Sequence, residues 1–187
     1  MKLLSLVERK KEKQIKKYIV ENKEALYRFA YSYVKNEDDA LDIVHDAICK
    51  SLDNVNTLKN IDSIKSWIYQ IVSNCAIDYI RKNKKYVAIT DDLQEENTMR
   101  YDTYEDIDLQ EALERLPEKY RIVVILRYFE DMKIGDIAQV LNENENTIKT
   151  RLYNGLSKLK IELIEEEEWI FWKKIISWKI WKKITII

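Results

Sequence analysis

Apolar residues recur along most of the chain at intervals of three and four, the spacing that places them on one face of an α-helix. Residues 88–105 interrupt this pattern, because they lack a sustained apolar face. The chain is therefore expected to form two groups of helices joined by a linker. The predicted helices lie near residues 13–34, 36–52 and 61–85 in the first group, and near 107–116, 117–129, 133–141 and 145–163 in the second.

The composition supports an all-α fold. The 187 residues include only two glycines and one proline, and 35% of them are charged. Folds rich in strands need many tight turns, which Gly and Pro supply. We therefore predict two small helical domains joined by an acidic linker, with separate cores. The predicted segments are a first domain over 1–87, the linker over 88–106, a second domain over 107–164, and a tail over 165–187.

Charge is distributed unevenly, although the net charge is only −1. Residues 1–90 carry 17 Lys and Arg against 12 Asp and Glu, whereas residues 91–116 carry 2 against 10. A basic block followed by an acidic connector indicates two modules with different partners.

The cysteines and the single histidine give little reason to expect a cofactor. Cys49 and Cys75 both lie in apolar helical stretches, where a cysteine is usually a small buried hydrophobic residue. His45 and Cys49 could share a helix face, but two ligands do not make a structural zinc site. Neither a metal nor another cofactor is therefore expected. The start of the chain does not resemble a signal peptide, so a cytoplasmic protein is expected.

Residues 133–163 have the pattern of a helix-turn-helix. Ala138 allows the two helices to cross closely, Asn142 suits a left-handed position in the turn, and Asn144 can cap the second helix. A second helix of this kind enters the major groove of DNA. A plain helical hairpin with a solvated face is the alternative. The residues predicted to face outward are Lys149, Thr150, Arg151, Tyr153 and Asn154.

A second candidate nucleic-acid surface lies on the helix near 61–85. Its basic residues could neutralise phosphates, and nearby aromatic side chains suit unstacked bases. The alternative is a core helix whose basic last turn complements its dipole. The residues expected on this surface are Asn74, Asp78, Arg81, Lys82 and Lys85.

Taken together, these stretches resemble the sigma factors of bacterial RNA polymerase, in particular the small two-domain extracytoplasmic-function (ECF) group. The resemblance covers about residues 15–163. It rests on YSYVKNEDDALDIVHDAICKSLDN (31–54), IKSWIYQIVSNCAIDYIRKNKK (64–85), LERLPEKYRIVVILRYFEDMKIGDIAQVL (113–141) and TIKTRL (147–152), in this order and spacing.

The resemblance implies a role for each candidate surface. Asp42, His45 and Asp46 would bind core RNA polymerase, although many members of the family have Gln in place of His45. The Asn74 surface would bind the −10 promoter element and capture a flipped base, and the Lys149 surface would bind the −35 element. Many members have a basic residue in place of Asn154. The acidic linker would lie in a basic channel of the polymerase. An anti-sigma factor is a possible further partner.

The tail at 165–187, with four of the five tryptophans, is not explained by this family. It could be an interfacial membrane anchor, a docking segment for an inhibitor protein, or an extension without a role. A chain truncated after Ile164 tests these interpretations, because unchanged promoter activity and solubility would support the last.

Other functions stay open from the residues alone. A helix-turn-helix regulator that works without polymerase would bind duplex DNA by itself, and a helical adaptor would bind no nucleic acid. No enzyme is expected, because the chain has one histidine, no glycine-rich phosphate loop and no pair of carboxylates with a reason to be buried.

Overall fold

The computed structural model of the protein describes residues 6–87 and 107–164, and every secondary-structure element in these two ranges is helical. The predicted all-α fold is confirmed. The expectations for the linker at 88–106 and for the tail at 165–187 lie outside the described residues.

The first domain is built from three helices, α1 (Leu6–Val34), α2 (Glu37–Asp53) and α3 (Ile64–Val87). The chain turns between α1 and α2 at Lys35, which has a left-handed φ of 54°. Asn36 then caps α2, since its side chain accepts a hydrogen bond from the Asp39 backbone at 3.0 Å. Three acidic residues in the first turn of α2 complement the positive end of its dipole.

Aromatic rings fill the centre of the first domain. The ring of Phe29 meets that of Tyr33 edge-on, with centroids 5.4 Å apart, and lies 5.0 Å from that of Tyr69. All three side chains are buried. Tilted and edge-on contacts of this kind stabilise a core beyond the burial of apolar area.

The second domain contains four helices and one π-helical turn. These are α4 (Ile107–Arg115), α5 (Glu118–Val124), the π-helical turn Ile125–Phe129, α6 (Ile134–Leu141) and α7 (Glu145–Ile164). Pro117 stands directly before α5. Proline lacks a backbone N–H, and at this position an N–H would have no acceptor within the helix. The helices predicted from the apolar spacing are all present. α1 begins at Leu6 rather than near residue 13, and the helix predicted at 117–129 is divided into α5 and the π-helical turn.

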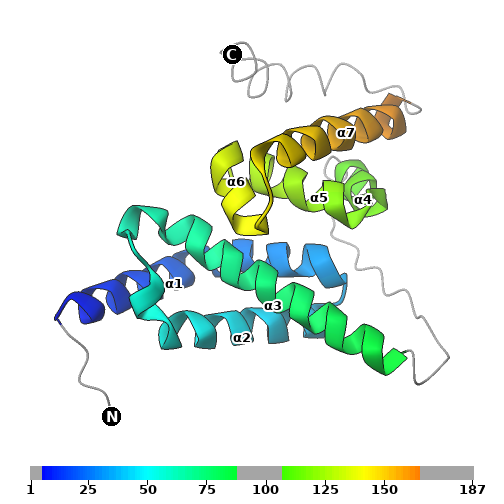
Figure 1. Ribbon diagram of the computed structural model, residues 1–187. Helices are drawn as coiled ribbons and strands as arrows, with labels where there is room; N and C mark the ends of the chain where they lie inside the picture. Colours follow the sequence, from blue (N-terminus) through cyan, green and yellow to red (C-terminus); the bar gives the residue numbers. More distant parts are fainter. Residues whose placement is uncertain (1–5, 88–106, 165–187) are drawn as a thin grey trace.

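The expectation of separate cores is met only in part. The second domain has a small buried cluster of its own, formed by Ala112, Leu113, Leu116, Val124 and Leu159, but its other buried side chains share a core with the first domain. In Figure 1 the helices of residues 107–164 lie directly on those of residues 6–87. α6 packs against α3, and α5 packs against α1. Buried side chains of the second domain, among them Ile122, Leu126 and Ile137, continue the core of the first. The apolar side chains of α5 and α6 therefore pack against helices of both domains. The spacing of apolar residues along the chain does not reveal this double contact.

The buried tyrosines make the stability of the fold sensitive to alkaline pH. Burial raises the pKa of both Tyr33 and Tyr69 above the ordinary value of a tyrosine. Burial, followed by the nearby Glu130, raises the pKa of Tyr18 to about 12. The folded state thus holds these protons more tightly than the unfolded chain. The resulting stability is complete below about pH 10 and is lost as the pH rises further.

We therefore expect the free energy of unfolding, measured by urea denaturation, to fall between pH 9 and pH 12. The loss is up to ~1.4 kcal/mol per buried tyrosine for each pH unit. Tyr33→Phe should make this decline shallower, whereas Tyr153→Phe should not, because Tyr153 is exposed. Equal slopes in the two variants would contradict the assignment.

Candidate nucleic-acid interface

The turn between α6 and α7 has the geometry predicted for a helix-turn-helix. Asn142 adopts a left-handed conformation, with φ 52° and ψ 45°, and ends α6. Asn144 caps α7, because its side-chain oxygen accepts from the Thr147 backbone at 2.7 Å and lies 3.0 Å from the Thr147 hydroxyl. Both predictions from the turn sequence are confirmed. The cap fixes the direction in which α7 leaves the turn.

Removing this cap should destabilise the second domain. Asn144→Ala is expected to lower the free energy of unfolding by ~1 kcal/mol, the typical cost of losing an asparagine cap. Chemical denaturation followed by circular dichroism measures this change. Asn146→Ala is the matched control, because it makes the same change at an exposed position in the first turn of α7 and leaves the cap at Asn144 in place. It should leave the midpoint nearly unchanged. If the two variants behaved alike, the cap would not be a determinant of stability.

The outer face of α7 presents most of the residues predicted to read DNA. Lys149, Thr150 and Tyr153 are exposed, the last with 75% of its surface accessible. Arg151 is only partly exposed, and its guanidinium donates to Glu143 at 2.8 Å. Asn154 is also only partly exposed. The structure therefore brings three of the five side chains onto one open surface, while Arg151 is held against the turn.

α3 carries the second predicted surface, and most of it is open to solvent. Asn74, Arg81 and Lys82 are exposed, and Asp78 is partly exposed. Asp78 accepts a hydrogen bond from Arg81 at 2.9 Å, so a phosphate would compete with this carboxylate for the guanidinium. Lys85 belongs to the last turn of α3, but its side chain lies outside the described residues.

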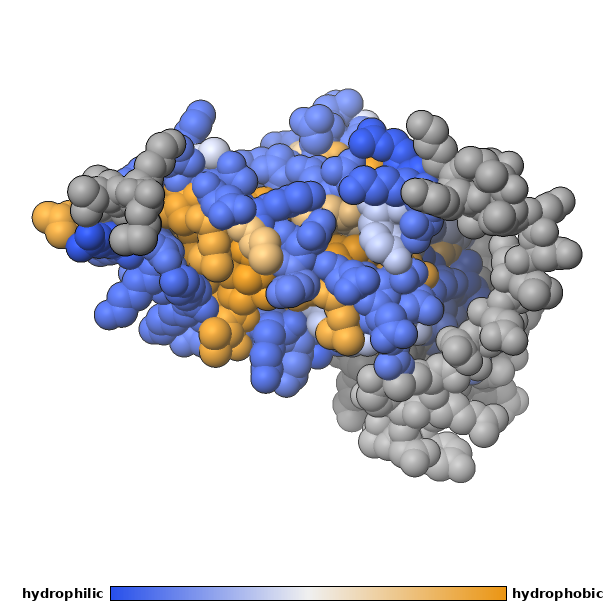
Figure 2. All heavy atoms as spheres, turned by 90° about the horizontal axis from the view of Figure 1, so that it is seen from below, coloured by the Kyte–Doolittle hydropathy of each residue, from blue (hydrophilic) through white to orange (hydrophobic). Residues whose placement is uncertain are grey.

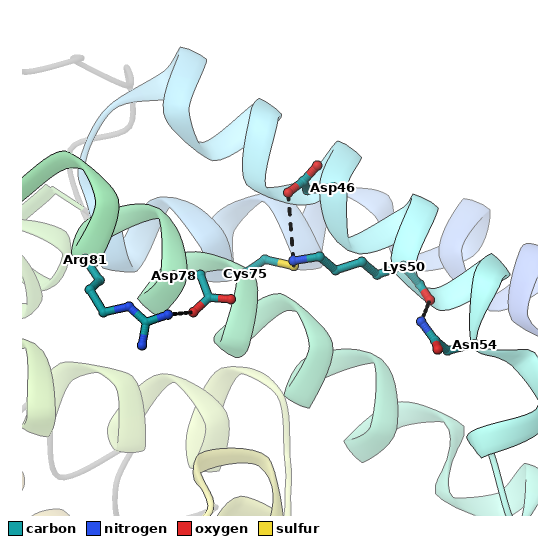
Figure 3. A network of polar contacts seen from close by, with 6 residues as sticks. All are labelled: Asp46, Lys50, Asn54, Cys75, Asp78 and Arg81. Atoms are coloured by element: carbon teal, nitrogen blue, oxygen red, sulfur yellow. Dashed lines mark hydrogen bonds and ion pairs between the residues drawn. The ribbon is translucent and has the colours of Figure 1, made fainter.

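A small polar network joins α2 to the inner edge of this surface (Figure 3). The ammonium group of Lys50 lies 3.4 Å from the Cys75 sulfur and 3.9 Å from a carboxylate oxygen of Asp46. Burial raises the pKa of the Cys75 thiol, while Lys50 acts in the opposite direction. Cys75 is therefore protonated at neutral pH and has a structural role. Cys49, in contrast, is exposed, so its prediction as a buried residue is wrong.

α2 presents the three residues predicted to bind polymerase. Asp42, His45 and Asp46 are all exposed, and their spacing of three and four places them on one side of the helix. Figure 2 views the molecule from below, and there apolar side chains lie among the charged ones. On α2, Leu41 is 56% exposed, and Val44, Ile48 and Leu52 are only partly buried. The spacing of apolar residues predicts this apolar strip as one face of the helix, but it does not show that the strip is left partly open on the candidate docking surface.

Two buried charged residues at the junction of the domains were also missed. Arg121 is 5% exposed and Glu130 is 8% exposed. Arg121 donates to the Ser32 carbonyl of the first domain at 2.9 Å. Glu130 accepts a hydrogen bond from Tyr69 of the first domain. One feature of the sequence could have indicated that Arg121 is buried, namely that it directly precedes the apolar run that begins at Ile122.

Neither a metal site nor a membrane span was found in the part of the chain that the structure describes. Within residues 6–87 and 107–164, no cluster of His, Cys, Asp and Glu has an arrangement that could hold a metal ion. Over the same ranges, each helix is too short or too polar to cross a bilayer.

Comparison with known protein families finds two matches, one in each domain. Residues 18–86 match the family described as sigma-70 region 2, and residues 106–159 match the family described as sigma-70, region 4.

Full-length relatives agree with these matches. The chain is 47% identical to RNA polymerase sigma factor SigV of Bacillus subtilis over 150 residues, which cover 80% of this chain and 90% of that protein. It is 28% identical to ECF RNA polymerase sigma factor SigW of the same organism over 157 residues, covering 75% and 84%.

Solved structures show a similar fold. The sigma factor RpoE of Bartonella quintana, crystallised with the anti-sigma factor NepR, superimposes with a TM-score of 0.73 at 23% identity, covering 81% of this chain and 97% of that one. CnrH, determined in complex with the cytosolic domain of CnrY, gives a TM-score of 0.58 at 19% identity, covering 81% and 88%.

Proposed function

Because the chain belongs to the ECF group of the sigma-70 family of RNA polymerase sigma factors, we propose that it directs core RNA polymerase to promoters. In this proposal it binds the core enzyme, recognises a −10 and a −35 element, and helps to melt the DNA. The observation that carries the proposal is the pairing, in one chain, of a region 2 domain with an open polar and basic face on α3 and a region 4 domain with an exposed recognition helix α7.

The exposed residues of α7, α3 and α2 support a separate binding role for each of these three surfaces. We infer that Lys149, Thr150 and Tyr153 contact the −35 element from the major groove, with Arg151 and Asn154 at the edge of the contact. On α3, Arg81, Lys82 and Lys85 would hold the DNA backbone, with Asp78 beside them, and Asn74 would capture an unpaired base. On α2, Asp42, His45 and Asp46 would bind the polymerase, together with the apolar strip at Leu41.

Reconstituted transcription tests this function directly. Core polymerase with the protein should initiate from promoters of the source genome, whereas core polymerase alone should not. A protein that neither binds core polymerase nor supports initiation would contradict the proposal. If the free protein bound a specific duplex tightly without polymerase, an independent helix-turn-helix regulator would be the better description.

Asn74 provides a sharper test of promoter melting. Asn74→Ala should reduce open-complex formation on duplex promoters by about tenfold, which corresponds to ~1.4 kcal/mol of lost base capture. The loss of open-complex formation should be smaller on promoters that are melted beforehand. On these templates the base is already unpaired, so its capture no longer has to compensate for the cost of extruding it. Gln14→Ala, at an exposed position of α1, is the control. Equal losses on the two templates would exclude a role linked to melting.

The same inference places the protein in the cytoplasm, where a bacterial chain of this kind meets polymerase and DNA. It also assigns the protein no catalytic reaction of its own, since in this family the polymerase carries out the chemistry. An anti-sigma factor is a further candidate partner, because RpoE and CnrH were both solved in complex with another protein and RpoE's partner is an anti-sigma factor. Copurification from the native organism tests this partner.

A further inference from the structure

The first three turns of α1 carry a concentration of positive charge that the family matches do not account for. Residues 6–17 contain six Lys and Arg against two Glu, whereas residues 18–34 contain two residues of each charge. The match to sigma-70 region 2 begins only at residue 18. We refer to residues 6–17 as the basic segment. Its charge is a feature of this chain for which the proposed function has so far given no role.

One row of lysines in the basic segment is open to solvent. Lys10, Lys13 and Lys17 recur at intervals of three and four, so they lie on one face of α1, and all three are exposed. Lys17 lies 3.8 Å from Glu21 in an exposed pair, which contributes little. Lys10 and Lys13 form no ion pair with any residue that the structure describes. The row spans about 10 Å of helix, enough to contact roughly two to three successive phosphates of a nucleic-acid strand.

The basic segment lies at the end of the first domain where α3 begins. Lys11 donates to the Leu58 carbonyl at 2.5 Å, which holds the segment against the loop between α2 and α3. In Figure 1 the start of α1 lies beside this loop, at the opposite end of the domain from the last turn of α3. The chain leaves α3 toward the domain proposed to bind the −35 element, upstream of the −10 element. The basic segment therefore faces the downstream side, where the promoter is melted.

We propose that Lys10, Lys13 and Lys17 bind the backbone of the melted non-template strand just downstream of the −10 element. This contact rests on the proposed sigma-factor function. Neutralising phosphates holds a strand in place without reading its sequence. Residues 6–17 include no aromatic side chain on which a base could stack, so the contact is with the backbone. Holding the separated strand there opposes its pairing with the template strand and so stabilises the open complex.

The test measures binding of core polymerase with the full-length protein to two promoter templates. In both, the −10 element is a single non-template strand, which continues to the start site in the long template and ends at the −10 element in the short one. Lys10→Gln combined with Lys13→Gln should weaken binding to the long template about tenfold at low salt. The slope of log K against log salt should fall in magnitude by about 1.4, because each phosphate contact on a single strand contributes ~0.7. On the short template the variant should bind like the wild type.

Lys23→Gln combined with Lys119→Gln is the matched control. It removes the same charge at exposed positions outside the basic segment and should change binding to neither template. If the Lys10 and Lys13 variant behaved like this control on the long template, the proposal would be overturned. Equal losses on the long and the short template would also overturn it, because the strand downstream of the −10 element would then not be what the lysines bind.

Two further measurements identify any other occupant of the basic segment. A loss of affinity for core polymerase in the absence of DNA would assign the lysines to the polymerase instead. A loss of binding to phosphatidylglycerol vesicles, with unchanged binding to the long template, would assign them to a membrane surface. Either result overturns the strand contact while leaving the sigma-factor function intact. A wild-type protein that supports binding to neither template would overturn the function, and the contact with it.

Discussion

Gly155→Val is expected to unfold the second domain or to lower its free energy of unfolding by ~3 kcal/mol, the upper end of the usual cost of overpacking a core. Gly155 is buried in α7 where this helix crosses α5 closely. A Cβ atom at this position would lie 3.1 Å from the Val124 side chain and 3.3 Å from the Cβ atom of Tyr120. Valine would add two more carbons in the same space, so α7 would have to move away from α5. Urea denaturation and transcription by the reconstituted polymerase from a promoter that depends on its −35 element both report this change.

Two substitutions serve as controls for Gly155→Val. Gly155→Ala adds only the Cβ atom, and its crowding is opposed by a gain in helix propensity of about 1 kcal/mol. It should therefore have a much smaller effect. Ser157→Val introduces the same β-branched side chain at an exposed position of α7 and should cost only a few tenths of a kcal/mol. If Gly155→Val were no worse than Ser157→Val, close packing of α7 on α5 would be refuted.

Arg121→Met should be the most destabilising charge removal among the described residues, because each buried carbonyl left without a donor costs ~1–3 kcal/mol of unfolding free energy. The guanidinium of Arg121 donates to three backbone carbonyls, those of Ser32, Glu114 and Leu116, at 2.9–3.1 Å. Methionine fills a similar volume but leaves these carbonyls without a donor. Because one acceptor lies in the other domain, the variant should also loosen the junction. Chemical denaturation measures the loss of stability. Energy transfer between fluorescent labels on the two domains measures the loosening of the junction.

Arg115→Met is the matched control for Arg121→Met. Arg115 is exposed and pairs with Glu111 one turn away at 3.1 Å. Exposed pairs of this kind contribute at most about 0.5 kcal/mol. Arg121→Lys should recover little stability, because one ammonium group cannot reproduce the fork of the guanidinium. Similar losses in Arg121→Met and Arg115→Met would show that the buried bonds do not stabilise the fold.

The sequence predicted the local structure of this protein well, because each local feature has a local cause. The apolar spacing predicted the helices, and the turn chemistry predicted the left-handed Asn142 and the cap at Asn144. The placement of Lys149 and Tyr153 on an open face followed from the same spacing. These features depend on residues within a few positions of one another.

The association of the domains could not be predicted in this way. Arg121 meets Ser32, which lies 89 positions earlier in the chain. Glu130 meets Tyr69, which lies 61 positions earlier. A charged residue among apolar ones is usually taken for a boundary of the core, and only a distant partner shows that it is buried. The exposure of Leu41 was missed for the converse reason, since it fits the apolar period of α2 but is left 56% exposed by the residues that the structure describes.

The π-helical turn at Ile125–Phe129 makes the contact between the domains depend on chain length as well as on chemistry. Such a turn holds more residues than an α-helical one, and Glu130 comes directly after it. The turn accommodates one extra residue within a helical segment, so deletion of one residue here would restore a regular α-helix and leave Glu130 facing nearly the same direction. Deletion of one residue within α5 would instead rotate everything that follows by about 100° around the helix axis and turn this carboxylate away from Tyr69. The contact should therefore tolerate a shorter chain inside the π-helical turn and not in the α-helix before it.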